Sequence, residues 1–223
     1  MPCGAALPQT IVCAAGGSPA DVSFPGFAMR TLSEVVATPK RELPKLLREG
    51  HPIDPTARDN TVYHGVSLGL PRWAERVSWK TFAKTFYRAS PEDPLFGWNI
   101  RVEQKGIGSP TQPKVRKGQP WCFGYYGVTS SRGYKVPADY AHGLLIQYRF
   151  GPNAAFDPVN LVRDPLVALN PDDPSLLFGW SYVHLGRAVW TPSYFVLQAE
   201  GPITHVPAAM EDWGTPKKML LPA

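Results

Sequence analysis

The 223-residue sequence predicts a mainly β protein built on one closed or sandwiched antiparallel sheet. Nearly every apolar segment after residue 95 alternates apolar and polar side chains, as a half-buried strand does. The 25 Pro and 20 Gly residues divide the chain into short segments, which disfavours long helix bundles. Hydrophobic residues make 43% of the chain and charged residues 18%, a composition that excludes an intrinsically disordered protein. No apolar run approaches the roughly 18 residues of a membrane helix, so we expect a chain that does not span a membrane.

The N-terminal region separates from the rest by composition. Residues 1–28 are rich in Ala, Gly and Pro without periodicity, which predicts a flexible arm followed by a single domain over 29–223. Within that domain, Leu43, Leu46 and Leu47 have helical spacing before Gly50, which predicts a short helix with one leucine face.

Cysteine usage bears on the compartment. Cys3, Cys13 and Cys122 are too few and too scattered for a disulfide framework or a thiolate zinc site. The leader lacks the basic segment of a strong secretory signal, so we expect a cytoplasmic protein, with a weak secretory signal as the alternative.

The segment from residue 61 to residue 88 predicts a strand followed by the longest helix. Apolar and polar residues alternate over 61–68, and Pro71 suits a first helical turn. A helix of about 17 residues over 72–88 would pack its aromatic side on the sheet. Its other side carries a series of basic residues four apart: Arg72, Arg76, Lys80, Lys84 and Arg88. We expect this stripe to contact an acidic partner or an anionic ligand head rather than nucleic acid, because no aromatic residue is interleaved on it for base stacking.

Strand patterns account for most of the remaining chain. They cover residues 98–105, 121–128, 142–150, 161–169, 176–185 and 193–199. Such a series after one long helix favours a closed or sandwiched antiparallel sheet over alternating strand–helix units.

One pentapeptide matches the nucleophile motif of serine hydrolases. Gly65-Val66-Ser67-Leu68-Gly69 has the form G-x-S-x-G, in which the serine stands on a sharp strand-to-helix turn. Pro71 would delay that helix by several residues, and the strand–helix alternation of a hydrolase is missing. A serine hydrolase with Ser67 as nucleophile is therefore an alternative to the main hypothesis.

The histidines offer two further alternatives. Neither H-x-x-x-H nor H-E-x-x-H spacing occurs, no phosphate-binding glycine loop is present, and we expect no metal site. An inward-facing His64 or His184 would suit a haem-binding barrel, although no cofactor is indicated. A histidine with an aspartate would suit an isomerase or cyclase, for which residue type alone suggests Asp139, Asp157 and Asp164.

Several short stretches together resemble a known family. The glycine-flanked segment 65–69 is followed by Ala83-Lys84-Thr85-Phe86, and later by 143–146, 177–179 and 194–197. This arrangement is similar to the GXWXG-type proteins of the lipocalin-like, or calycin, group and covers roughly residues 60–200. Ser67 stands where that family has tryptophan. The resemblance implies a small lipocalin-like antiparallel β-barrel, of roughly seven to nine strands with one flanking helix, and carries over no catalytic residue.

The function that follows is the binding of a small molecule. Aromatic residues make 12% of the chain and polar groups do not cluster, which is typical of an apolar ligand site. A barrel of about eight strands can hold one small ligand. We expect a non-enzymatic protein that binds an apolar or amphipathic small molecule in the barrel. The candidate ligand-binding residues are Trp98, Tyr148, Trp180, Tyr182 and His184.

Overall fold

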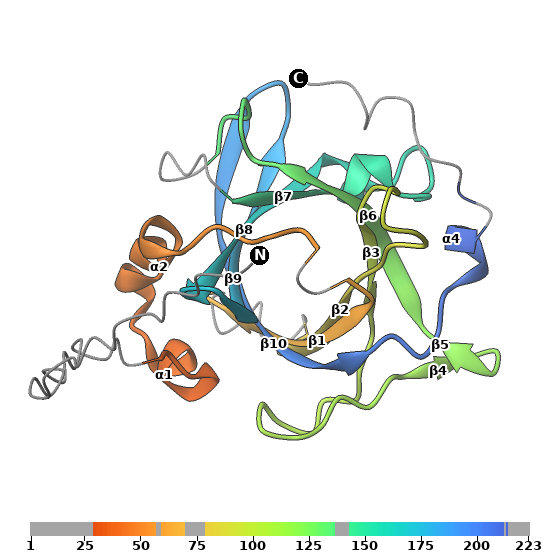
Figure 1. The fold of residues 1–223 in the computed structure, drawn as a ribbon, viewed down its shortest axis with the longest axis horizontal. Helices are drawn as coiled ribbons and strands as arrows, with labels where there is room; N and C mark the ends of the chain where they lie inside the picture. The colour runs from red at the N-terminus through yellow and green to blue at the C-terminus, as the bar shows by residue number, and fades with distance from the viewer. Residues whose placement is uncertain (1–28, 57–58, 70–78, 137–142, 212, 214–223) are drawn as a thin grey trace, which may run out of the picture.

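A closed antiparallel β-barrel of eight strands forms the centre of the molecule (Figure 1). The computed structural model describes residues 29–56, 59–69, 79–136, 143–211 and 213. The barrel strands are β1 (Thr61–Leu68), β2 (Thr81–Phe86), β3 (Phe96–Ile100), β6 (Cys122–Ser130), β7 (Leu144–Gln147), β8 (Val162–Asn170), β9 (Asp173–His184) and β10 (Ala188–Pro202).

Each barrel strand pairs with its neighbour in the sequence, and β10 closes the ring on β1. The short hairpin of β4 (Val115–Arg116) and β5 (Gln119–Pro120) lies outside the ring and interrupts only the connection from β3 to β6. The predicted antiparallel barrel is confirmed, and each of the six strand segments expected after residue 95 overlaps an observed strand. Closure leaves the eight described strands of the barrel without an unpaired edge strand.

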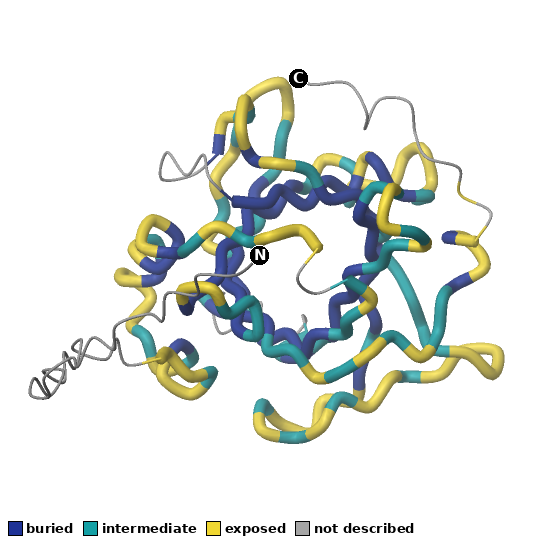
Figure 2. Tube along the Cα trace, viewed as in Figure 1, coloured by how far each residue is buried: buried dark blue, intermediate teal, exposed yellow. Residues whose placement is uncertain are grey.

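Both faces of the barrel wall are buried, and Figure 2 shows the strands as a dark blue ring. Strand alternation sends every second side chain inward. The inner cluster contains the aromatic residues Tyr63, Phe86, Tyr126, Tyr148 and Phe195, with aliphatic side chains between them.

Two short helices cover the outer face of β8, β9 and β10. They are α1 (Leu32–Ala37) and, after the 3₁₀ turn η1 (Lys40–Glu42), α2 (Leu43–Glu49). Thr31 and Glu34 form a capping box at the start of α1. The leucine face predicted for the second helix is buried in the outer core.

The opposite outer wall is covered by the C-terminal segment. Met210 of α4 (Ala208–Glu211) packs in a cluster with Ala83, Trp98 and Ile100, which project outward from β2 and β3. Figure 1 shows α4 across the barrel from α1 and α2. None of the helices in the described part of the chain is long and apolar enough to cross a membrane.

The segment after α2 closes one end of the barrel. His51 forms an isolated bridge with Ala168, and Ile53 packs against the inner cluster. Ile53, Asp54 and Pro55 line a small space together with Tyr63 and other inner side chains of that end. In Figure 1 this segment crosses the barrel opening that faces the viewer.

The helix predicted over 72–88 is wrong where the structure describes it. Thr81–Phe86 is strand β2, paired with β1 and β3, whereas residues 70–78 lie outside the described residues. Threonines on one face alternate with Phe82, Lys84 and Phe86 on the other, and β-branched and aromatic residues favour strands. Both faces of β2 are buried in the barrel wall, whereas a surface helix would bury only one side.

Replacing Phe86 by alanine tests the inner packing. Its ring makes edge contacts with Tyr63 at 5.4 Å and Tyr126 at 6.2 Å between ring centroids. We expect Phe86→Ala to lower the free energy of unfolding by about 3–5 kcal/mol in urea titrations. Phe156→Ala is the matched control: this side chain is 98% exposed, so its loss should change stability by less than about 0.5 kcal/mol. Equal effects would contradict the packing.

Candidate functional site

A cavity of about 190 Å³ occupies the barrel end remote from Ile53. Three adjacent strands, β1, β10 and β9, each place a serine at this end, and the small size of these side chains leaves space for the cavity. Its apolar lining comes from Trp79, Phe82, Phe123, Val159, Val162 and Phe195. Its polar lining comes from Ser67, Lys84, Asn99, Tyr148, Asp164, Ser181 and Ser193, with Tyr194 beside them. Val159 belongs to the 3₁₀ turn η4 (Pro158–Leu161). An apolar wall with a few convergent polar groups is the usual make-up of a small-ligand site.

Lys84 lies at the deep side of this cavity with 1% of its surface exposed. It stands opposite Tyr63 of β1 and Asn99 of β3 in the strand register, so its side chain points into the barrel. Its Nζ lies 4.6 Å from the ring centre of Tyr126 and 5.4 Å from that of Phe195. A lysine amine among aromatic rings is separated from water.

A hydrogen-bond network joins Lys84 to the opposite wall. The amine donates to the Tyr148 hydroxyl at 2.8 Å and lies 3.5 Å from Asp164 Oδ2. Tyr148, the first residue of the 3₁₀ turn η3 (Tyr148–Phe150), donates its hydroxyl to the same Oδ2 at 3.1 Å. Asn99 Nδ2 donates to the Gly124 carbonyl at 2.9 Å and approaches the Tyr148 hydroxyl at 3.5 Å. Amine, phenol and carboxylate therefore form one connected unit.

One oxygen of this unit is left without a partner. Asp164 is 1% exposed, and its Oδ1 accepts no hydrogen bond from the described part of the chain. Asp164 lines the cavity. A buried carboxylate oxygen without a donor costs free energy, which a ligand hydroxyl or N–H group in the cavity would recover.

Burial sets the protonation chemistry of the unit. Removal from water lowers the pKa of Lys84, and the neighbouring Asp164 carboxylate offsets that effect only in part. Burial also raises the pKa of Tyr148 well above its usual value, with Asp164 contributing in the same direction. At neutral pH Tyr148 is consequently a neutral phenol, whose hydroxyl can donate a hydrogen bond.

The glycines of the G-x-S-x-G pentapeptide have packing and turn roles. A Cβ on Gly65 would stand 2.5 Å from the ring of Phe82, and Gly69 has a positive φ of 79° next to the Pro192 carbonyl. Ser67 lies inside antiparallel β1 rather than on a strand-to-helix elbow. No histidine lines the cavity among the described residues, so this site offers Ser67 no imidazole base.

Of the five residues expected to bind a ligand in the barrel, only Tyr148 lines the cavity. Trp98 is fully buried on the outer side of β3, under the C-terminal segment. Trp180 and Tyr182 project outward from β9 into the outer core. Tyr182 and His184 line a different, outer pocket of about 270 Å³ with Arg163 and basic neighbours. Strand alternation places these four residues on the outer face of the barrel, so they do not line the inner cavity.

The other histidine and aspartate candidates do not gather in the barrel. His64 also projects outward, where its Nδ1 lies 2.9 Å from Thr111 Oγ1. Neither His64 nor His184 faces the interior as an axial haem ligand would. Asp157 caps η4, and Asp139 lies outside the described residues. The described residues contain no cluster of side chains suited to a metal ion.

The basic stripe expected on a helix is dispersed by the strand. Lys84 points into the barrel, and Arg88 forms an ion pair with Asp59 at 2.7 Å. Lys80 donates to the Ser67 carbonyl at 3.0 Å. Arg72 and Arg76 lie outside the described residues. Three described members therefore have separate structural environments and form no common exposed surface.

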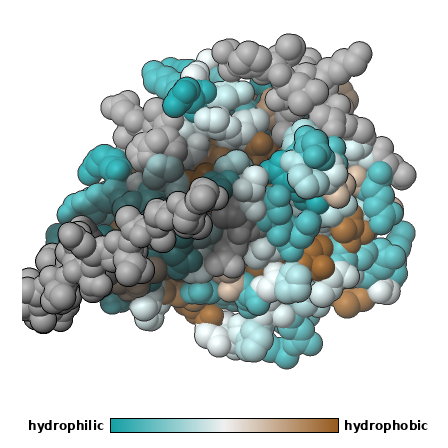
Figure 3. All heavy atoms as spheres, in the orientation of Figure 1, coloured by the Kyte–Doolittle hydropathy of each residue, from teal (hydrophilic) through white to brown (hydrophobic). Residues whose placement is uncertain are grey.

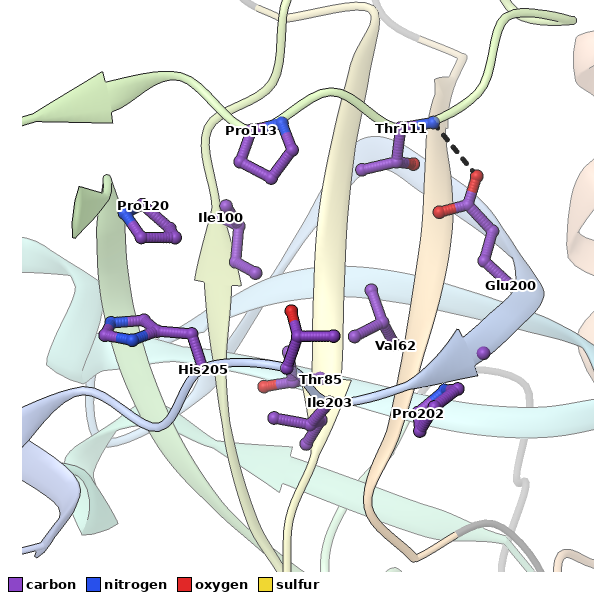
Figure 4. Close-up of a pocket in the computed structure, with 12 residues that line it drawn as sticks. Val62, Thr85, Ile100, Thr111, Pro113, Pro120, Glu200, Pro202, Ile203 and His205 are labelled. Carbon is purple, nitrogen blue, oxygen red and sulfur yellow. Dashed lines mark hydrogen bonds between the residues drawn. The ribbon is translucent and has the colours of Figure 1, made fainter. Parts of the chain in front are cut away.

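Another cavity, of about 260 Å³, lies on the outside of the barrel between β1, β3 and the C-terminal segment (Figure 4). The face seen in Figure 3 shows hydrophobic residues among hydrophilic ones on the side of β4, β5 and α4. Glu200 in this cavity already accepts a hydrogen bond from the Thr111 N–H. The Thr85 hydroxyl likewise forms hydrogen bonds with the backbone carbonyl and N–H of Trp98. The inner cavity, with its buried ionisable groups, is the stronger candidate site.

Comparisons with protein-family models, with curated proteins and with solved structures found no match to this chain. The functional argument consequently rests on the residues of the inner cavity.

Sequence reasoning missed Lys84 and Asn99 as site residues and weighed Asp164 by residue type alone. The available signal was a charged residue inside an apolar segment. Lys84 stands between Phe82 and Phe86, and Asp164 is separated by Pro165 from the four apolar residues 166–169. A charge at such a position is either exposed or paired inside the protein.

A double-mutant cycle tests the pairing of Lys84 with Asp164. Lys84→Met leaves a buried carboxylate without its cation, and Asp164→Asn leaves a buried amine without its anion. We expect each to lower the free energy of unfolding by about 3–5 kcal/mol at pH 7. The double variant should be clearly more stable than the sum of the two losses predicts.

The exposed pair Lys114–Glu103, 3.9 Å apart, provides the control for that cycle. Lys114→Met should change stability by no more than about 0.5 kcal/mol, because water screens the pair. Strict additivity of Lys84→Met and Asp164→Asn would show that the two side chains do not interact.

Proposed function

We propose that this protein binds an amphipathic small molecule in the inner cavity of its barrel. The apolar part of the ligand packs against the phenylalanines and valines of the cavity wall. Its polar group meets the Lys84–Tyr148–Asp164 unit. The single observation that carries this proposal is the buried Asp164, which lines the cavity and whose Oδ1 has no hydrogen-bond donor among the described residues.

Cavity size narrows the ligand class. A cavity of about 150 Å³ in an apolar core is large enough for benzene. At about 190 Å³, the present cavity suits a benzene-sized molecule with one polar substituent, or the corresponding end of a longer molecule. A hydroxyl group fits the polar unit best, because it donates to Asp164 Oδ1 and accepts from the Lys84 amine.

The proposed relationship to lipocalin-like proteins is compatible with this function. An eight-stranded barrel has an interior wide enough for one small ligand, and the up-and-down order of strands is the order of that architecture. The binding hypothesis itself depends on the cavity residues and not on this relationship.

Binding of benzyl alcohol by the full-length protein is the direct test. Calorimetry or NMR titration should detect one site that binds benzyl alcohol about tenfold or more tightly than toluene, since a hydrogen bond to a charged group contributes roughly 1.5–3 kcal/mol. Mass spectrometry of small molecules that remain with the natively purified protein should then identify the ligand class.

Filling the cavity should remove that binding. Ser193 lines the cavity from β10, so Ser193→Phe places a ring where the ligand would lie. We expect at least a tenfold loss of benzyl alcohol affinity with the barrel's far-UV circular dichroism retained. Ser33→Phe, at an exposed position of α1, makes the same chemical change and should leave the affinity unaltered. Equal binding by both variants would place the ligand elsewhere and refute the proposal.

A further inference from the structure

Lys84 has the placement of a nucleophilic amine rather than of a purely structural cation. It is 1% exposed, lines the cavity, and is surrounded by the rings of Tyr126, Tyr148 and Phe195. Most lysines are protonated at neutral pH because water solvates the ammonium group. Lys84 lacks that solvation, and burial lowers its pKa. A desolvated lysine at the floor of a ligand cavity is the arrangement in which amines form covalent bonds with carbonyl compounds.

We propose that Lys84 forms a reversible imine with an aldehyde or ketone group of the ligand. This inference rests on the proposed binding function and extends the polar group of the ligand from a hydroxyl to a carbonyl, whose addition product with Lys84 again presents a hydroxyl to Asp164 Oδ1.

The step balances with groups already present. The lone pair of Lys84 Nζ adds to the carbonyl carbon, and a proton moves from nitrogen to the carbonyl oxygen to give a carbinolamine. Departure of that hydroxyl as water, with loss of the second nitrogen proton, leaves the C=N bond. Amine and carbonyl thus give imine and water, with no oxidant or reductant. Addition of water reverses the step.

Tyr148 and Asp164 act on this step as positioning residues. The Tyr148 hydroxyl accepts from Lys84 Nζ at 2.8 Å and donates to Asp164 Oδ2 at 3.1 Å, so it can relay a proton between amine and carboxylate. Asp164 Oδ1 is free to accept a hydrogen bond from the carbinolamine hydroxyl. The titratable groups that face Lys84 are Tyr63 on β1, Tyr126 on β6, Tyr148 on η3 and Asp164 on β8.

Reductive trapping with benzaldehyde and sodium cyanoborohydride tests the inference on the full-length protein at pH 7. Among the lysine side chains we expect one benzyl group per chain, assigned to Lys84 by peptide mapping, whereas exposed lysines such as Lys45 and Lys105 stay largely unlabelled. Lys84 should carry more label than any exposed lysine, because a lowered pKa leaves a larger unprotonated fraction of this amine at pH 7. Benzaldehyde without reductant should be released on dilution.

Three variants separate a reactive amine from a merely accessible one. Lys84→Arg should abolish the label, while Lys45→Arg, at an exposed position of α2, should leave it unchanged. Asp164→Asn removes the carboxylate that favours the ammonium form, so the midpoint of the trapping-versus-pH curve should move to lower pH. If Lys84→Arg does not fold, the mapped site and the pH curve of the unmodified protein still decide the question.

The outcomes distinguish this inference from the binding proposal. Benzyl alcohol binding that is lost in Ser193→Phe, together with no label on Lys84, would refute the imine and keep the binding site. Label spread over exposed lysines with Lys84 unmodified would likewise refute the imine. Absence of both binding and label would refute both proposals.

Discussion

The interior of an eight-stranded barrel must be filled by side chains, and the rest of this structure depends on how that filling is achieved. Such a barrel is just wide enough for one layer of inward-pointing residues. At the end closed by Ile53, aromatic and aliphatic side chains fill the interior and leave a space of only about 20 Å³. Glycines make the rings possible: a Cβ on Gly179 would stand 2.2 Å from the Phe195 ring. At the other end serines replace large residues, and the cavity is what remains.

Lys84 and Asp164 connect opposite walls of this barrel. In the ring of strands, β2 and β8 are separated by three strands on either side, so their inward side chains meet across the diameter. The interaction between them therefore fixes the depth of the cavity as well as its chemistry. A buried pair of this kind contributes little net stability, because desolvation offsets the attraction, yet breaking it leaves an isolated buried charge. The pair constrains the site more than it stabilises the fold.

The barrel could be predicted from the sequence because alternation and turn residues mark strands locally, but two features could not. A spacing of four residues, as in Lys80, Lys84 and Arg88, places side chains on one side of a helix and also on one face of a strand. The β-branched residues Thr81 and Thr85, together with pairing to β1, decide for the strand. Local sequence contains no information on that pairing.

The second feature that the sequence could not predict is which side chains point into the barrel and which point outward. In a barrel exposed to water on the outside, polar residues identify the outer face. Here α1, α2 and the C-terminal segment cover much of the wall, so the outer face is apolar as well. Trp98 and Trp180 are aromatic like many inner residues, but they pack on the outer face of the barrel. Under such double burial, the informative residues are the charged ones: a lysine on a doubly covered strand has no solvent to reach, so it must face the cavity and its partner. Lys84 follows that rule, because its side chain is buried inside the barrel within 3.5 Å of Asp164.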